Sequence, residues 1–264
     1  MWALVLFSLV FAVVYNFSMW YASRLENVPS FILSFEDRIP FLPWTIIPYL
    51  SSGVFFWAVF SRLNAKAALH TFLKRVLLMT VLAGIGFILM PLQYSYPKPE
   101  INNPVFGFLF RFLDGVDDPY NQSPSLHVAF AFAFWTVFRE ISSRWRMVAA
   151  VWLILVALST LTTYQHHLID IFTGSILAHL VFIIFPSQPR GYGVRNLHVA
   201  NYFFLAGWCF ISAAFILSEF NGVYWLNLLW PALAMFVLGY QYQKENIGDV
   251  KGELVRILVR RKIL

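Results

Sequence analysis

The chain has 264 residues, of which 59% are apolar and only 12% are charged. Charged residues normally make up about a quarter of a soluble globular chain, so this composition excludes a water-soluble domain. The net charge of +6 does not indicate a nucleic-acid partner, because most basic residues lie in the connections between apolar segments. Cys209 is the only cysteine, so no disulfide is expected.

Eight apolar segments, each about long enough to cross a bilayer as a helix, follow one another along the chain. They cover residues 2–21, 44–61, 71–92, 123–139, 145–164, 167–186, 199–218 and 223–241. The first segment lacks a basic start and a small-residue cleavage site, so we expect it to stay as a membrane helix rather than be removed as a signal peptide. The pattern predicts an all-α, polytopic helix bundle that forms a single domain over residues 1–264.

The basic residues predict how this bundle is oriented, because cytoplasmic connections carry an excess of Lys and Arg. Fifteen of the 19 basic residues fall on the side that also holds both termini, whereas Arg24, Arg38, Lys98 and Arg111 fall on the other side. We therefore expect both termini in the cytoplasm. The tail after Lys244 is expected to lie as an amphipathic helix on the cytoplasmic membrane surface.

A first polar cluster precedes the fourth apolar segment, on the expected outer side. It reads Ser123-Pro124-Ser125-Leu126-His127. Ser123 could cap a helix, Pro124 suits the first helical position, and Ser125 presents a hydroxyl in the first turn. Because a helix N-terminus binds anions through its free N–H groups, His127 would lie against a bound phosphate. The alternative is an ordinary helix cap with an interfacial histidine.

A second polar cluster, residues 159–170, precedes the sixth apolar segment. His166 and Asp170 are four residues apart and would share one face of a helix. Asp170 could accept a hydrogen bond from the N–H of one ring nitrogen of His166, which leaves the other nitrogen unprotonated and free to react. A purely structural pair is the alternative, although a carboxylate beside an apolar run is costly without a functional reason.

A metal site is the competing chemical interpretation of these clusters. His127, His166, His167 and Asp170 could supply ligands, but their spacing fits no pattern such as HExxH, and cysteine ligands are absent. We therefore expect neither a metal nor another cofactor.

Together the clusters resemble the motifs of the type 2 phosphatidic acid phosphatase (PAP2) superfamily, which read KxxxxxxRP, PSGH and SRxxxxxHxxxD. Residues 124–127 resemble the second motif, with leucine replacing glycine. Residues 159–170 resemble the third motif, with Thr160 in the place of its arginine. Lys98-Pro99 resembles the end of the first motif, and Pro91 stands in the place of its lysine. The PSLH form and the histidine pair look more like the branch of inositol phosphorylceramide synthases and related bacterial proteins.

The resemblance implies a six-helix core, motifs over residues 91–170, additional spans over residues 199–241, and metal-independent phosphoryl transfer. His166 would form a phosphohistidine, Asp170 would orient it, and His127 would protonate the leaving oxygen. The phosphate oxygens would be held by Lys98, Ser125 and Ser159. Arg111 could replace the positive charge that Thr160 does not provide.

The most direct functional prediction is a lipid-phosphate phosphatase that transfers phosphoryl groups to water at the outer face of a bacterial plasma membrane. One alternative is a lipid phosphotransferase that passes a phosphoryl group or a phospho-headgroup to an alcohol. Another is a non-catalytic lipid-binding or transport protein. The expected partners are a lipid phosphate and membrane lipids, with no nucleic acid.

Overall fold

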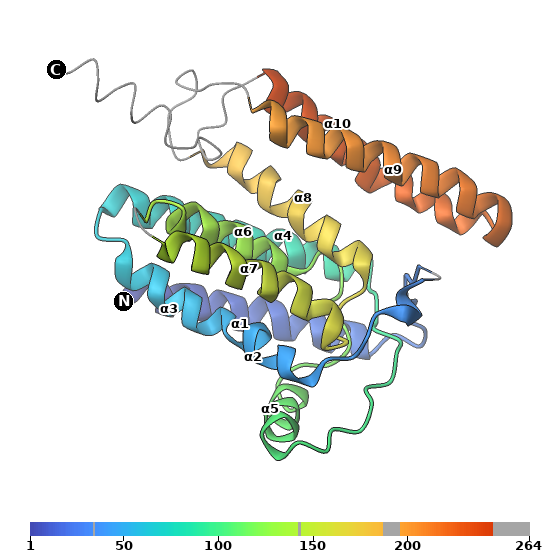
Figure 1. Cartoon of the computed structure of the whole chain (residues 1–264), viewed down its shortest axis with the longest axis horizontal. Helices are drawn as coiled ribbons and strands as arrows, with labels where there is room; N and C mark the ends of the chain where they lie inside the picture. The colour runs from blue at the N-terminus through green and yellow to red at the C-terminus, as the bar shows by residue number, and fades with distance from the viewer. Residues whose placement is uncertain (34, 142–143, 187–195, 245–264) are drawn as a thin grey trace. The chain divides into compact units, whose positions relative to one another are not determined.

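The computed structural model describes residues 1–33, 35–141, 144–186 and 196–244, and in these it contains only helices (Figure 1). The expected amphipathic tail after Lys244 lies outside the described residues. The elements are α1 (Trp2–Ser23), η1 (Glu36–Arg38), η2 (Pro43–Thr45), α2 (Ile46–Leu50), α3 (Ser52–Arg62), α4 (Lys66–Leu89), α5 (Pro104–Asp114), α6 (Leu126–Phe138), α7 (Trp145–Thr162), α8 (Leu168–Ile184), α9 (Leu197–Asn221), η3 (Val223–Leu228) and α10 (Leu229–Lys244).

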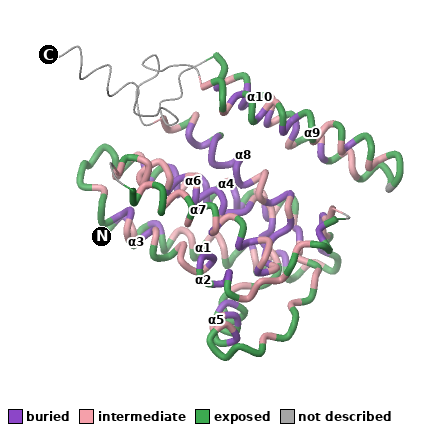
Figure 2. Tube along the Cα trace, viewed as in Figure 1, coloured by how far each residue is buried: buried purple, intermediate pink, exposed green. Residues whose placement is uncertain are grey.

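Six stretches of helix are long and apolar enough to cross a membrane, consistent with an integral membrane protein. They are Trp2–Ser23, Pro43–Arg62, Lys66–Leu89, Trp145–Thr162, Leu197–Phe220 and Val223–Lys244. Many of their large apolar residues are exposed, as expected for helices that contact lipid, and Figure 2 marks exposed residues along these helices in green.

The other two predicted segments also form helices, but shorter ones. α6 has 13 residues and α8 has 17 residues. α6 begins later than the predicted segment 123–139, because residues 123–125 stay outside the helix, whereas α8 begins only one residue after the start of the predicted segment 167–186. The two short helices begin within the histidine motifs at residues 124–127 and 159–170. The non-helical chain before each helix carries polar groups of the site described below.

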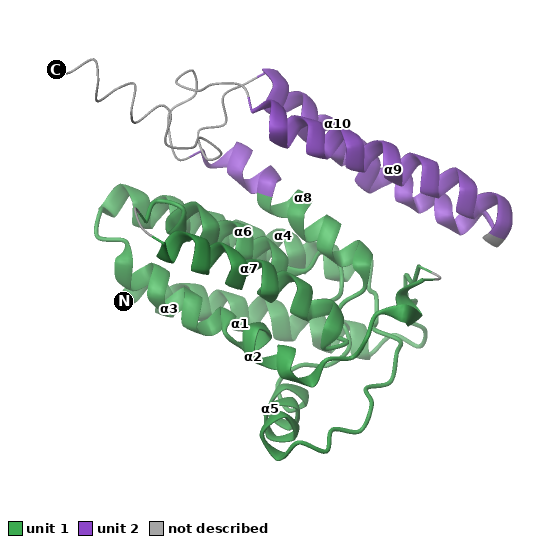
Figure 3. Ribbon diagram, viewed as in Figure 1, with its two compact units in different colours: residues 1–178 green, residues 179–264 purple. Residues whose placement is uncertain are grey.

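The described residues divide into two compact units, residues 1–178 and residues 179–264 (Figure 3). In the first unit, α1 packs against α4, α6 packs against α7 and α4, and α2 packs against α7. Phenylalanine rings fill the space between these helices. The Phe56 ring centroid lies 4.3 Å from that of Phe7, 4.7 Å from that of Phe134 and 4.9 Å from that of Phe130.

The second unit is built on the pairing of α9 with α10. His179, near the end of α8, lies with its Nδ1 2.6 Å from the Tyr242 hydroxyl of α10. This buried contact satisfies two polar groups that are packed among apolar side chains such as Phe182 and Phe203, so we interpret His179 as structural.

Candidate active site

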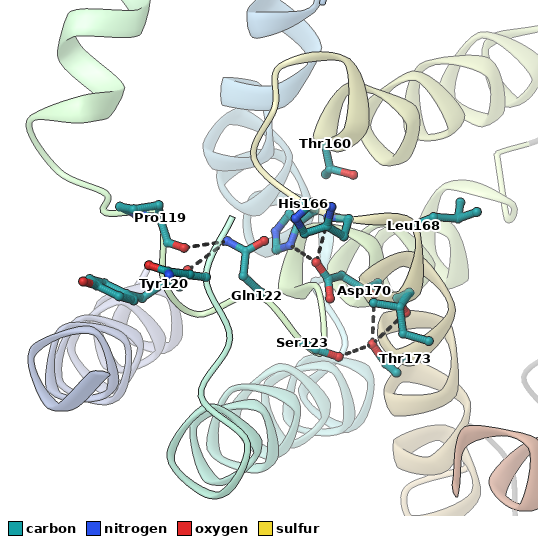
Figure 4. Close-up of polar contacts among 12 residues, drawn as sticks. Pro119, Tyr120, Gln122, Ser123, Thr160, His166, Leu168, Asp170 and Thr173 are labelled. Carbon is teal, nitrogen blue, oxygen red and sulfur yellow. Dashed lines mark hydrogen bonds and ion pairs between the residues drawn. The ribbon is translucent and has the colours of Figure 1, made fainter. Parts of the chain in front are cut away.

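The contact between His166 and Asp170 that the spacing predicts is present (Figure 4). Nδ1 of His166 lies 3.3 Å from Oδ2 of Asp170. His166 lies just before α8 rather than on it, so the two residues do not share a helical face as predicted. Asp170 instead reaches back from the first turn of α8, where the same Oδ2 accepts the His167 backbone N–H at 2.9 Å. The carboxylate therefore caps the helix and orients His166 at once.

The turn that carries His166 is closed by one backbone carbonyl. The Thr160 carbonyl accepts the N–H groups of Gln165 and His166 at 3.1 and 3.0 Å. The Thr160 hydroxyl donates to the Ala157 carbonyl at 2.7 Å and is fully buried. Thr160, which stands where the SRxxxxxHxxxD motif has arginine, therefore shapes the turn but provides no positive charge.

The N-terminus of α6 lies against the first turn of α8. The backbone N–H of Ser125 donates to the Asp170 carbonyl at 3.1 Å, and the Ser123 and Thr173 hydroxyls lie 2.8 Å apart. Ser125, not Ser123, is the cap residue of α6, so the predicted cap position is wrong. The reason is tertiary: the hydrogen bonds to α8 hold residues 123–125 outside the helix.

His127 lies in the first turn of α6, opposite His166. Their ring centroids are 6.3 Å apart. The Tyr49 ring from α2 stacks on the His127 ring with a centroid distance of 4.0 Å and an interplanar angle of 25°. Tyr49 itself is buried with Ile46, Phe110 and Leu113. The imidazole of His127 is therefore held in one orientation by an aromatic side chain that the sequence analysis did not identify.

A second histidine–carboxylate pair lies directly beside the first. Nδ1 of His167 lies 2.9 Å from Oε2 of Glu36, which also accepts the Leu168 backbone N–H at 3.1 Å. His167 is 2% exposed and its Nε2 has no hydrogen-bond partner. The Tyr94 ring stacks on it with a centroid distance of 4.5 Å. The sequence analysis missed Glu36, which lies far from the motifs along the chain.

The two serines predicted to hold phosphate differ in their hydrogen bonding. The Ser125 hydroxyl is fully buried and has no partner, so it is available to a ligand. The Ser159 hydroxyl donates to the Val156 carbonyl at 2.7 Å. A serine hydroxyl has a single proton to donate, so Ser159 can donate a hydrogen bond to a phosphate oxygen only after its bond to the Val156 carbonyl is broken.

A cavity of about 450 Å³ lies beside the His166 turn. It is lined by Tyr164 and Gln165, by Asp114 at the end of α5, and by residues from the two loops that flank α5. Lys98 lines it, and its Nζ lies 2.5 Å from Oδ1 of Asp114. Arg111 is exposed on α5 and is not among the lining residues. The structure thus brings Lys98 to the site in an ion pair and leaves Arg111 outside the cavity.

Asp117 also lines this cavity, and the sequence analysis did not single it out. Its Oδ1 accepts a hydrogen bond of 2.8 Å from the Tyr15 hydroxyl. Burial raises the pKa of the Asp117 carboxyl to about 6. The hydrogen bond from Tyr15 and the charges of His166 and Lys98 act in the opposite direction and lower this pKa, whereas the charge of Asp118 raises it further. A carboxyl group beside His166 therefore changes charge close to neutral pH.

Among the described residues, no group of three or more His, Cys, Asp or Glu side chains is arranged to hold a metal ion. The four candidate ligands instead divide into three sets: the His166–Asp170 pair, the His167–Glu36 pair, and His127 beneath Tyr49.

Residues 72–193 match the sequence model of the PAP2 superfamily. The match includes both histidine motifs and the turn that carries Thr160. This superfamily comprises phosphatases and phosphotransferases. No curated protein and no solved structure matches the chain.

Proposed function

We propose that the protein is a membrane phosphoryl-transfer enzyme that acts on a lipid phosphate through a phosphohistidine at His166. The observation that carries the proposal is the arrangement of His166, Asp170 and His127. One imidazole is oriented by a buried carboxylate at 3.3 Å, and a second imidazole faces it with a centroid distance of 6.3 Å. A nucleophile with an orienting group, opposite an acid–base group, is what a two-step displacement at phosphorus requires.

In the first step, the Nδ1–H of His166 donates a hydrogen bond to Asp170, so that the unprotonated Nε2 carries the free electron pair. Nε2 attacks phosphorus, the bond from phosphorus to the lipid oxygen breaks, and His127 donates a proton to that oxygen. In the second step, His127 removes a proton from the acceptor, whose oxygen attacks phosphorus and breaks the N–P bond. His166 and His127 then return to their initial states.

The transition state also needs positive potential around its phosphate oxygens, because this is the main requirement of phosphoryl transfer. With Thr160 in the arginine position, we propose that it comes from the N-terminus of α6, whose first N–H groups lack intrahelical partners. The unpartnered Ser125 hydroxyl lies at the same helix end.

Water is the acceptor in the principal form of the proposal, which makes the protein a lipid phosphatase. The burial of the site favours a second form, in which an alcohol replaces water. His166 is 7% exposed and Asp170 is fully buried, and a site that excludes water protects a phosphohistidine from hydrolysis. From the distribution of Lys and Arg, we further propose that the site opens on the outer side of the membrane and both termini are cytoplasmic.

Turnover by the purified full-length protein tests the proposal. In detergent micelles with phosphatidic acid and a metal chelator, the wild type should release phosphate. His166→Ala should lower the rate by roughly 10⁴-fold or more, as expected when a nucleophile is removed. His198→Ala, which changes an exposed histidine at the start of α9, should retain the wild-type rate. Equal rates for His166→Ala and the wild type would refute the nucleophile.

A further inference from the structure

Three tyrosine rings meet at the cavity beside His166. The ring centroids of Tyr94 and Tyr96 are 5.9 Å apart, those of Tyr94 and Tyr164 are 5.8 Å apart, and those of Tyr96 and Tyr164 are 6.1 Å apart. All three residues line the cavity and are half-buried. The face of an aromatic ring carries negative potential and attracts organic cations. One face of the Tyr94 ring is covered by His167, so Tyr96, Tyr164 and the remaining face of Tyr94 are the surfaces that a cation at this cavity would contact.

The charged groups of the same cavity also favour a cation. Asp114, Asp117 and Asp118 line it, and Lys98 is the only basic residue among the lining residues. Because Lys98 is paired with Asp114, Asp117 and Asp118 remain as an acidic excess when both are ionised. A headgroup that carries a positive charge suits this lining better than a phosphomonoester with two negative charges, such as phosphatidic acid, so the lining narrows the substrate class of the proposed function.

Gln165 supplies a separate indication of a ligand. Its side chain lines the cavity and is 9% exposed, and its Nε2 has no hydrogen-bond partner. A buried amide donor without a partner is costly unless a ligand provides an acceptor. Because Gln165 directly precedes His166, the expected acceptor is an oxygen of the phosphate that His166 attacks.

We propose that the cavity binds the headgroup of a zwitterionic phosphodiester lipid, in which an amino alcohol is esterified to the phosphate. The ammonium group lies against Tyr94, Tyr96 and Tyr164 and is neutralised by the acidic excess, while a phosphate oxygen accepts from Gln165. The volume of about 450 Å³ falls within the range of roughly 300–1,000 Å³ typical of small-molecule sites. The inference rests on the proposed function, since it names the substrate class of that same site.

The reaction of such a substrate follows the steps proposed above. Nε2 of His166 forms a bond to phosphorus, and the bond from phosphorus to the oxygen of the lipid alcohol breaks. That oxygen receives a proton from His127, and the amino-alcohol phosphate stays on His166. Water or an alcohol then gives a proton to His127 and attacks phosphorus, which releases the headgroup as a phosphomonoester or as a new phosphodiester.

Substrate selectivity tests the inference with the full-length protein in mixed micelles. The rates for phosphatidylcholine and phosphatidylethanolamine are compared with those for phosphatidylinositol, phosphatidylglycerol and phosphatidic acid. We expect a lower KM for the cationic headgroups. Tyr96→Leu should raise that KM roughly 3- to 30-fold, whereas Tyr96→Phe should restore it, because the ring face rather than the hydroxyl makes the contact.

Two acid substitutions form a matched pair for the charge argument. Asp118→Asn removes one carboxylate from the cavity and should weaken selectivity for the cationic headgroups. Glu100→Gln removes an exposed carboxylate that is not among the lining residues, and should leave selectivity unchanged. A change in kcat alone, with no change in the relative KM values, would contradict a role in headgroup binding.

Binding separates this inference from the proposed function. The His166→Ala protein is titrated with glycerophosphocholine and with glycerophosphoinositol. Tighter binding of the choline compound that is lost in a His166→Ala/Tyr96→Leu double variant would support the inference. This holds even if the wild type turns over no lipid, because absence of turnover would refute only the proposed function. Equal affinities, or no binding of either compound, would overturn the inference even if phosphatidic acid is hydrolysed.

Discussion

Gly174→Ala should damage the active site without touching any group that reacts. Gly174 lies in α8, one turn after Asp170, where α8 passes the N-terminus of α6. A Cβ atom at this position would lie 2.5 Å from the Ser125 carbonyl oxygen and 3.0 Å from Cβ of Val128. Backbone and β-carbon atoms cannot rotate away as the end of a flexible side chain can, so the two segments must separate.

The size of the effect follows from these distances. Restoring ordinary contact requires a displacement of roughly 0.5–0.9 Å. Ser125 is held on both sides, because its N–H donates to the Asp170 carbonyl and its own carbonyl accepts from Ala129, each at 3.1 Å. His127, two residues further, moves with it relative to His166. Because an error of about 1 Å in a reacting group can cost on the order of 10²-fold, we expect kcat to fall by roughly 10- to 100-fold.

The effect on stability should be smaller. Overpacking costs about 1–3 kcal/mol, and the better helix propensity of alanine offsets about 1 kcal/mol of this. Phosphate release and thermal unfolding of Gly174→Ala are measured beside Gly53→Ala, where the added Cβ meets nothing within 4 Å. The control should keep the wild-type kcat and unfold at the wild-type temperature or slightly above it. A Gly174→Ala protein with wild-type kcat would refute the close packing of α6 on α8 as the basis of the site geometry.

Three further predictions concern single side chains at the site. Asp170→Asn should lower kcat by on the order of 10⁴-fold, because an amide cannot hold His166 in the required tautomer; a loss below tenfold in the phosphate-release assay would contradict the orienting role. Tyr49→Leu should lower kcat about 2- to 10-fold by removing the ring that stacks on His127, whereas Tyr49→Phe should retain activity; equal losses would contradict a role of the ring. The preference for cationic over neutral headgroups should increase from about pH 5 to pH 7, because the Asp117 carboxyl, with a pKa of about 6, ionises over this range. The kcat/KM for phosphatidylcholine divided by that for phosphatidylglycerol measures the preference; a ratio that does not change with pH, or that changes identically in Asp117→Asn, would contradict this.

The helical architecture could be predicted from the sequence because apolar runs of bilayer length leave few alternatives. The start of α6 could not be predicted, nor could the position of His166 just outside α8. Ser123 and Ser125 are equally suitable cap residues, and what decides between them is the hydrogen bond from Ser125 to the Asp170 carbonyl. That contact joins segments that are 45 residues apart along the chain, and no local pattern encodes it.

In the site too, contacts between residues close in sequence could be predicted, whereas contacts between distant segments could not. The spacing of His166 and Asp170 predicted their contact, because four residues span a single turn whether or not the histidine is itself helical. Glu36, Tyr49 and Asp117 left no comparable signal. Glu36 and Tyr49 reach the motifs from a distant part of the chain, and Asp117 lies in the loop before α6. As single residues they resemble ordinary loop acids and an ordinary core aromatic.

The central claim is the covalent intermediate on His166. The wild-type protein is incubated with substrate, stopped in alkali and examined by mass spectrometry of its peptides, because an N–P bond survives base and is labile in acid. We expect an acid-labile phosphoryl group on His166 in the wild type and in His167→Gln, and none in His166→Ala. A phosphoryl group on His167 or on a serine, or turnover without any phosphoenzyme, would contradict it.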